Sequence, residues 1–265
     1  MRKTTLYYVA SAILSVWILF PIALLVISTF AVPEDYYDTR QLLPLRYTLD
    51  NLLGVFFSLG LWKNVAISLI VAMLCIIISM GLGVPAGYAL ARYSFKGKEP
   101  LKTVLIAMRA FPLLVIAVPL AVIFMRVGLA DTPLGVALAH SILAIPIVIF
   151  MSYSTFAAIP PQIEESAYID GLDEIGAFLH VTLPASAPGL AAVAIQVFII
   201  SWNETFIAGI LTLANRTLPA EVLGSVLTAP DPYKFAGAFI MMLPALLFTF
   251  ALRRRLVAAW GITLR

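Results

Sequence analysis

Acidic side chains are concentrated in one internal segment of the chain. Of its 14 Asp and Glu residues, five lie close together: Glu164, Glu165, Asp170, Asp173 and Glu174. The surrounding stretch, residues 158–184, contains no Lys or Arg. Carboxylates can take part in acid–base catalysis or in contacts with a partner, and the other reactive residues decide between these roles.

The residues that enzymes use for catalysis are missing or scattered. Gly97-Lys98-Glu99 does not complete a phosphate-binding loop of the Gly-x-x-x-x-Gly-Lys-Ser/Thr type. The sequence has no Gly-x-Ser-x-Gly or His-Glu-x-x-His pattern, and His140 and His180 are far apart. The single cysteine, Cys75, lies in an apolar run, which excludes a disulfide framework. We therefore expect no enzymatic activity, no catalytic residue, no metal site and no cofactor bound by this chain.

The acidic segment has the sequence features of two short helices at an angle. Pro160 and Pro161 end the preceding helix and suit the first turn of the next one. The two adjacent glutamates follow at once, where the helix dipole favours negative charge. Gly171 provides a break, and Asp173 can cap a second helix. We expect Pro184 to end the unit.

The second helix of this segment carries an apolar stripe at helical spacing, formed by Leu172, Ile175, Gly176 and Leu179. One interpretation is a helix that lies on lipid headgroups, but such helices usually carry Lys and Arg on their polar face. A helix with only acidic residues is repelled by anionic lipid. The pattern favours docking onto another protein.

The composition indicates where this segment must sit. Only 12% of the residues are charged and 62% are hydrophobic, whereas soluble domains carry about 25% charged residues. This excludes a typical soluble enzyme, a disordered protein and a nucleic-acid binder. Segments long and apolar enough to cross a membrane are 6–30, 64–90, 103–125, 134–157, 187–208 and 235–252. We predict an all-α membrane protein with six transmembrane helices.

The distribution of Lys and Arg predicts the orientation. With the N-terminus inside, the inner segments carry more basic residues than the outer segments, so both termini are expected to be cytoplasmic. The acidic segment is then an inner loop. We divide the chain into a first helix with an external segment, a transmembrane domain that contains the acidic loop, and a cytoplasmic tail: residues 1–60, 61–252 with loop 158–184, and 253–265.

A few polar residues fall inside the apolar segments. Arg109 either extends to the cytoplasmic interface or faces a partner chain or a translocation path. Asn203 and Glu204 either pair with a neighbouring helix or contact a polar solute. His140 is interpreted as a hydrogen-bonded core residue rather than a ligand.

The spacing within the acidic loop resembles the signature of permease subunits of ABC importers, which reads Glu-Ala-Ala, three residues, Gly, nine residues, Ile-x-Leu-Pro. Here Glu165-Ser166-Ala167 is followed by three residues and Gly171, and nine residues later by Val181-Thr182-Leu183-Pro184. The spacing matches throughout. Ser166 in place of Ala and Val181 in place of Ile preserve size and shape.

Further motifs extend the resemblance over most of the chain. They are Tyr47–Asn51, Gly87–Gly97, Gly128–Thr132 and Trp202–Glu204. Together they resemble the carbohydrate-uptake branch, which includes the smaller permease of the maltose transporter. The C-terminus departs from that pattern, because Trp260–Arg265 replaces the usual Gly-rich ending and leaves a tail contact with the ATPase without support.

The resemblance implies a type I importer fold in the inner cell membrane. It implies a second permease in a heterodimer, two ATP-binding cassette subunits that use ATP and Mg, and an external binding protein that delivers a sugar or oligosaccharide. The residues it implies for coupling to the ATPase are Glu164, Glu165, Ser166, Ala167, Asp170, Gly171, Leu183 and Pro184. The alternatives are import of a non-sugar solute, such as a polyamine or an organic phosphate, a stand-alone secondary transporter or channel, and a membrane enzyme.

Overall fold

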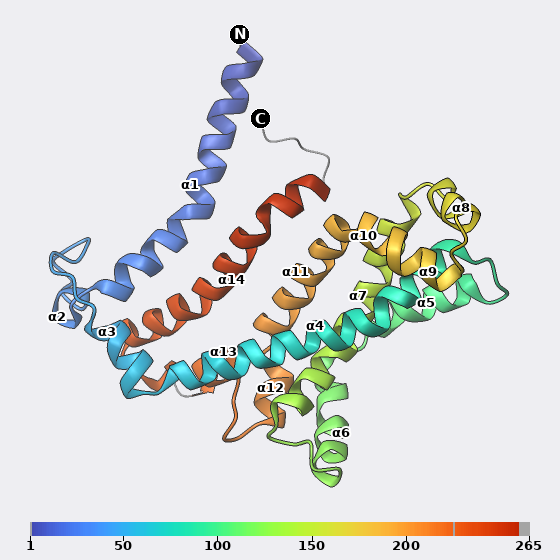
Figure 1. Ribbon diagram of the computed structural model, residues 1–265. Coiled ribbons are helices and arrows are strands. Elements are labelled where there is room, and N and C mark those ends of the chain that lie inside the picture. Colours follow the sequence, from blue (N-terminus) through green and yellow to red (C-terminus); the bar gives the residue numbers. More distant parts are fainter. Residues whose placement is uncertain (1, 225, 260–265) are drawn as a thin grey trace. The chain divides into compact units, whose positions relative to one another are not determined.

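The computed structural model describes residues 2–224 and 226–259, and the regular secondary structure of this part is helical apart from one isolated bridge between Ala31 and Tyr47 (Figure 1). The residues form two compact units. One consists of the chain up to Lys63 together with Glu221–Pro244, and the other of Asn64–Ala220 together with the chain from Ala245 onward.

The first unit contains α1, a long apolar helix, and the polar segment that follows it. Its helices before α4 are α1 (Arg2–Phe30), α2 (Pro33–Tyr36) and α3 (Asp50–Leu53), and α3 continues as a π-helical turn, Gly54–Ser58. The Asp35 carboxylate accepts hydrogen bonds from the Arg46 guanidinium at 2.6 and 3.1 Å. The Asn51 amide donates to the carbonyls of Thr29 and Ala31 at 3.0 and 2.7 Å. These bonds fold the segment back onto the end of α1.

The second unit holds the helices on which the acidic loop is built. The remaining helices of the chain are α4 (Leu61–Arg92), α5 (Lys98–Met108), α6 (Leu113–Arg126), α7 (Pro133–Ala157), α8 (Gln162–Ile169), α9 (Glu174–Ala177), α10 (Leu183–Ala185), α11 (Ala187–Asn203), α12 (Phe206–Leu211), α13 (Leu218–Gly224) and α14 (Asp231–Ala259), of which α13 and α14 lie partly in the first unit. Within this unit α7 packs against α11 and α12, and α12 also packs against α6 (Figure 1). The most enclosed side chains of the described residues include Phe156, Phe198 and Trp202.

Two glycines bring α4 into direct contact with α7. A Cβ atom on Gly83 would lie 2.6 Å from the Cγ1 atom of Val148, and one on Gly87 would lie 2.8 Å from the carbonyl oxygen of Ile149. Any larger side chain would push the two helices apart. This close approach sets the C-terminal end of α4, at Arg92, beside the C-terminal end of α7.

The described residues contain three helices that are long and apolar enough to cross a membrane: Leu6–Phe30 of α1, α4 and α7. Two bent helix pairs raise the number to five if each pair is one span. The segments Lys98–Met108 and Leu113–Arg126 meet at 90°, and Glu174–Ala185 and Ala187–Asn203 meet at 77°.

The predicted spans 103–125 and 187–208 are not single straight helices in the structure. The first is broken before Pro112, whose backbone is extended, because a proline disfavours helical geometry in the residue before it. The second ends at Asn203, because Glu204 has an extended backbone with φ −75° and ψ 125°. The last apolar helix, α14, is longer than the predicted 235–252. The divergent ending Trp260–Arg265 lies outside the described residues.

Candidate functional site

The acidic loop is a helix–turn–helix unit, as its sequence predicts. After α7 ends at Ala157, α8 starts directly behind the two prolines and ends before Gly171, which has φ +92°. That left-handed conformation suits glycine. The Asp173 carboxylate then accepts a hydrogen bond from the Gly176 amide at 2.8 Å and caps α9.

The end of the loop differs from the prediction. Residues Phe178–Thr182 form a π-helical turn that continues from α9 into α10. Pro184 lies in the first turn of α10 and does not end the unit. The chain instead bends by 77° between α10 and α11. The loop is therefore joined to α11 by a short, continuous run of helical turns.

Glu164 is the most connected side chain of the loop. It is 4% exposed, and its Oε1 atom accepts hydrogen bonds from the Nε atom of Arg92 at 2.9 Å and from the Thr182 hydroxyl at 2.7 Å. The Arg92 Nη2 atom is 2.8 Å from the same oxygen. The Tyr88 hydroxyl donates to Oε2 at 3.1 Å. One carboxylate thus joins the end of α4, the start of α8 and the segment before α10.

The Arg92 guanidinium extends this network to α7. It donates to the carbonyls of Phe156 and Ile159 at 3.0 and 3.1 Å, close to the point where α7 ends. Burial by itself would raise the pKa of Glu164, but the hydrogen bonds from Arg92 and Thr182 and the charge of Arg92 outweigh it, so the pKa lies below its ordinary value. Glu164 is therefore an ionised, fully paired anchor.

Aromatic rings cover this anchor. The Tyr88 ring lies 4.5 Å from Phe178 and 5.4 Å from Phe156, measured between centroids. The neighbouring Tyr93 hydroxyl donates to Glu174 at 3.0 Å, and this bond raises the pKa of Tyr93. The rings keep water from the ion pair, and the bond to Glu174 ties α9 to the end of α4.

The predicted coupling residues divide into an inner and an outer set. Glu164 and Ala167 are buried, and Leu183 packs partly buried beside the core. The exposed members are Glu165, Ser166, Asp170, Gly171 and Pro184. Exposed apolar side chains accompany them, with Ile169 at 87% and Ile175 at 68% exposure. The outer face of the loop thus combines acidic and apolar side chains.

A family comparison agrees with this geometry. Residues 83–260 match the model of a family described as "Binding-protein-dependent transport system inner membrane component". The chain belongs to this family. The matched region begins at Gly83, in the last third of α4, and includes the acidic loop and the helices from α5 to α14, so this permease is an inner-membrane component of a transport system.

Two named relatives are similar to this permease over nearly its whole length. "Trehalose transport system permease protein SugB" of Mycobacterium tuberculosis is 31% identical over 99% of this chain and 97% of its own. "Diacetylchitobiose uptake system permease protein NgcG" of Streptomyces coelicolor is 28% identical over 95% of this chain and 86% of its own. A bacterial ABC transporter that imports the acidic polysaccharide alginate has the same fold, with a TM-score of 0.75, 19% identity and coverage of 97% and 98% of the two chains.

The predicted path residues of the permease lie apart from the acidic loop. Arg109 is exposed at the break between α5 and α6, lines an apolar cavity of about 510 Å³, and has no ion-pair or side-chain hydrogen-bond partner among the described residues. Asn203 is exposed at the end of α11. Glu204 is buried beside His140, with the Nε2 and Oε2 atoms 3.0 Å apart. Glu204 therefore pairs with a neighbouring helix.

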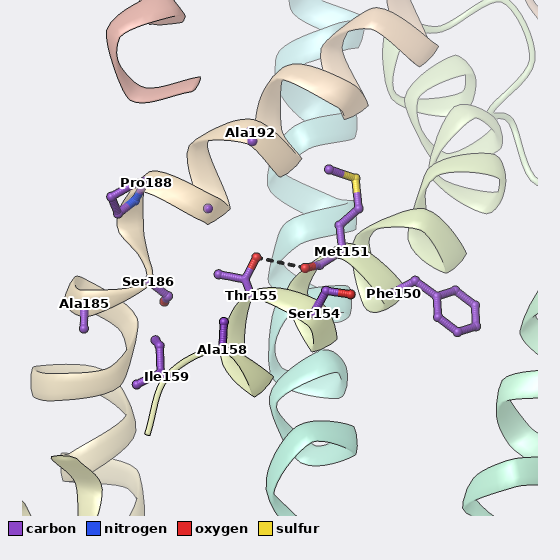
Figure 2. A pocket seen from close by; sticks show the side chains of 11 residues that line it. Phe150, Met151, Ser154, Thr155, Ala158, Ile159, Ala185, Ser186, Pro188 and Ala192 are labelled. Carbon is purple, nitrogen blue, oxygen red and sulfur yellow. Dashed lines mark hydrogen bonds between the residues drawn. The ribbon is translucent and has the colours of Figure 1, made fainter. Parts of the chain in front are cut away.

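A second cavity, of about 520 Å³, lies between the end of α7 and the start of α11, close to the loop (Figure 2). Its hydroxyl groups are largely used within the protein: Thr155 donates to the Met151 carbonyl and Ser186 to the Leu183 carbonyl, both at 2.9 Å. Across the described part of the chain no group of three His, Cys, Asp or Glu residues is arranged to hold a metal ion.

Sequence reasoning missed the partners of Glu164. Tyr88 and Arg92 lie four residues apart inside the motif Gly87–Gly97, so they share one face of α4. That spacing was the available signal, because two hydrogen-bonding side chains on one face at the end of a span need a common partner. Nothing in the sequence indicates that the partner is Glu164.

Proposed function

We propose that this permease imports a sugar or an oligosaccharide, and that its acidic loop transmits the movement of a partner ATPase to the membrane helices. The observation that carries the proposal is the Glu164 network, which fixes α8 to the ends of α4 and α7. A loop held in this way moves together with the helices it connects.

The outer face of the loop is the surface that meets the ATPase. Exposed Ile169 and Ile175 provide apolar contact, and Glu165 and Asp170 surround them with negative charge. An ATPase groove with apolar walls and a basic rim complements this face. ATP binding changes the relative affinity of the loop for two arrangements of the ATPase subunits, and the membrane helices follow that population shift.

The assembly contains further subunits. Two ATP-binding cassette subunits hold ATP and Mg and carry out the hydrolysis, and an external binding protein delivers the solute. A second, different permease completes the path. In the first unit α1 leaves apolar side chains such as Leu14 and Trp17 exposed, at 60% and 80%, and lipid or the second permease covers them. The chain crosses the membrane six times, with both termini and the loop in the cytoplasm.

The solute class follows from the relatives. Two systems whose permeases resemble this chain over most of their length are named for trehalose and for diacetylchitobiose, which are both disaccharides. Arg109 and Asn203 are the polar side chains of the predicted set that face outward from the helices, and we place them along the path. Glu204 is buried next to Asn203 and does not itself face the path.

Reconstitution of the complete transporter tests the proposal. The chain is purified with its ATPase subunits and second permease, placed in proteoliposomes, and supplied with the binding protein and radiolabelled trehalose, diacetylchitobiose or an α-glucoside. We expect binding-protein-dependent ATP hydrolysis and uptake of at least one of these sugars. Uptake without any ATPase subunit would support a stand-alone transporter instead and would overturn the proposal.

A further inference from the structure

A second buried polar cluster lies in the second unit, away from the acidic loop. His140 of α7 is fully buried, with its Nδ1 atom 2.9 Å from the Ser201 hydroxyl and its Nε2 atom 3.0 Å from the Glu204 carboxylate. Ser201 and Glu204 are 3% and 7% exposed. An ionised carboxylate only accepts hydrogen bonds, so Nε2 carries the proton that is shared with Glu204.

The order Ser–His–Glu is also that of a hydrolase triad, but burial excludes that role. A nucleophilic hydroxyl must be reached by its substrate, and the Ser201 side chain is enclosed between helices. The cluster therefore has a structural role within the protein.

Glu204 uses its carboxylate to start α12. Its Oε1 atom accepts the amide of Ile207 at 2.8 Å, and its Oε2 atom accepts the amide of Ala208 at 3.0 Å. These amides belong to the first turn of α12, which has no hydrogen-bond partners of its own within the helix. His140 holds the same carboxylate from α7. Glu204 thus accepts the free amides at the start of α12 and, through His140, connects this helix to α7.

The far end of α12 is fastened by a second carboxylate. Asp131, in the turn before α7, accepts the amides of Leu213, Ala214 and Asn215 at 3.0, 3.1 and 2.9 Å. The start of α12 is therefore held by Glu204, which His140 of α7 contacts, and the segment after α12 is held by Asp131, in the turn before α7. The two carboxylates differ in position, because Glu204 lies at the break between α11 and α12 and Asp131 lies in the loop before α7.

The break leaves Asn203 exposed at the end of α11. Its Nδ2 atom donates to the Ile199 carbonyl at 2.9 Å, and its Oδ1 atom has no protein donor among the described residues. His140 lies seven positions after Pro133, which places the cluster about 10 Å along α7 at 1.5 Å per residue. A polar side chain exposed at this depth faces water, a solute or another chain rather than lipid.

We infer that His140 is a positioning residue that clamps Glu204, keeps the fifth span broken, and thereby holds the Asn203 amide in the translocation path as a hydrogen-bond acceptor for a hydroxylated solute. This inference rests on the proposed function, because the path and its solute belong to the importer. It adds that His140 and Glu204 act on the solute indirectly and that Asn203 contacts it.

A double-mutant cycle in the reconstituted transporter tests the inference. The variants are His140→Leu, Asn203→Ala and the two together, and Asp131→Asn serves as the control at the other end of α12. We expect His140→Leu to raise the KM for uptake roughly tenfold, because it leaves a buried carboxylate without its donor. Asn203→Ala should raise the KM by a similar factor, and the double variant should be no worse than His140→Leu alone.

The conservative variant separates positioning from general stability. His140→Gln retains an N–H donor for Glu204, so we expect it to restore most of the wild-type KM, and Asp131→Asn should leave the KM unchanged. Independent, multiplying effects of His140→Leu and Asn203→Ala would overturn the inference, as would a wild-type KM in His140→Leu. If His140→Leu does not assemble, Glu204→Gln takes its place in the same cycle. If the wild-type complex takes up no sugar, the proposed function itself is contradicted. If the wild-type complex takes up sugar but the His140 variants keep the wild-type KM, only this inference is contradicted.

Discussion

Arg92 and Glu164 are 72 residues apart in the sequence, yet the Nε atom of Arg92 donates to the Glu164 carboxylate at 2.9 Å. Arg92 ends α4, and Glu164 lies in the first turn of α8. Because the same guanidinium also binds carbonyls at the end of α7, this pair joins two long apolar helices to the acidic loop. Any force on α8 is passed to both helices.

Removal of the Arg92 side chain should uncouple ATP hydrolysis from transport. In Arg92→Leu the Glu164 carboxylate stays buried without its cation, and breaking a buried pair in this way costs about 3–5 kcal/mol. We expect uptake to fall by more than tenfold while the complex still hydrolyses ATP. Uptake and ATP hydrolysis are measured together in proteoliposomes. The control is Glu99→Gln, which breaks the pair between the exposed Glu99 carboxylate and Lys102, where water screens the two charges. Equal uptake in both variants would contradict this prediction.

A charge reversal on the outer face of the loop should weaken docking without unfolding the loop. Glu165 is exposed and makes no ion pair among the described residues, so Glu165→Lys leaves the anchor intact. We expect less ATPase subunit to co-purify with the permease and an unchanged melting temperature. Glu34→Lys, an exposed site in the first unit, makes the same change in net charge and should retain the ATPase. Undiminished co-purification in Glu165→Lys would show that this face does not touch the ATPase.

Gly171→Pro should also uncouple transport, through the shape of the loop. Proline fixes φ near −65°, whereas Gly171 has φ +92°, so the turn between α8 and α9 cannot form as it stands. We expect normal membrane insertion and expression with loss of solute uptake, measured in cells or vesicles. Normal uptake at normal expression would contradict the role of this turn.

The attachment of α8 should resist mild acid. Because the pKa of Glu164 is lowered in the folded protein, its contribution to stability is fully present above the ordinary glutamate pKa of about 4.3 and is lost as the pH falls through the lower, folded value. Hydrogen exchange of the α8 amides, corrected for intrinsic rates, should therefore stay constant from pH 7 to about 5. Glu164→Gln should show faster exchange throughout this range. Loss of protection in the wild type near neutral pH would contradict the prediction.

The contact between α4 and α7 should tolerate no side chain at Gly87. A Cβ atom there would lie 2.8 Å from the Ile149 carbonyl oxygen and 2.9 Å from the Tyr153 amide nitrogen, and backbone atoms cannot move aside easily. Gly87→Val should therefore destabilise the protein by about 1–3 kcal/mol or more. Gly81→Val is the matched control on the same helix, because nothing lies within 4 Å of the added atom. Thermal unfolding in detergent compares the two, and equal melting temperatures would count against close packing at Gly87.

Local signals made the acidic loop predictable. Two prolines, a glycine and an acidic cap specify the ends of α8 and α9, and each acts within a few residues. The break at Pro112 was also readable, since a proline disturbs the residue before it, but the continuous apolar run concealed it. The break at Asn203 is partly local, because Glu204 accepts the amides of Ile207 and Ala208, three and four residues later. The histidine that binds the same carboxylate lies in another helix, and only the tertiary structure brings the two together.

The same distinction applies to the candidate site. The exposed face of the loop follows from its sequence, because composition alone favours a docking surface there. The inner face does not, since the anchor combines residues of α4, α8 and the segment before α10. Glu164 was assigned together with its exposed neighbours, although its side chain points the opposite way and holds the loop to the membrane helices.

The most direct measurement is a photo-crosslink from the tip of α8. Ile169, which is 87% exposed, is replaced by a photoreactive phenylalanine analogue in the complete transporter, and Leu42, which is 98% exposed in the first unit, carries the same group as the control. We predict a covalent adduct between position 169 and an ATP-binding cassette subunit, and none from position 42. A position 169 that crosslinks only to lipid, in a complex where the ATPase subunit is present, would contradict the assignment of this loop as the contact with the motor.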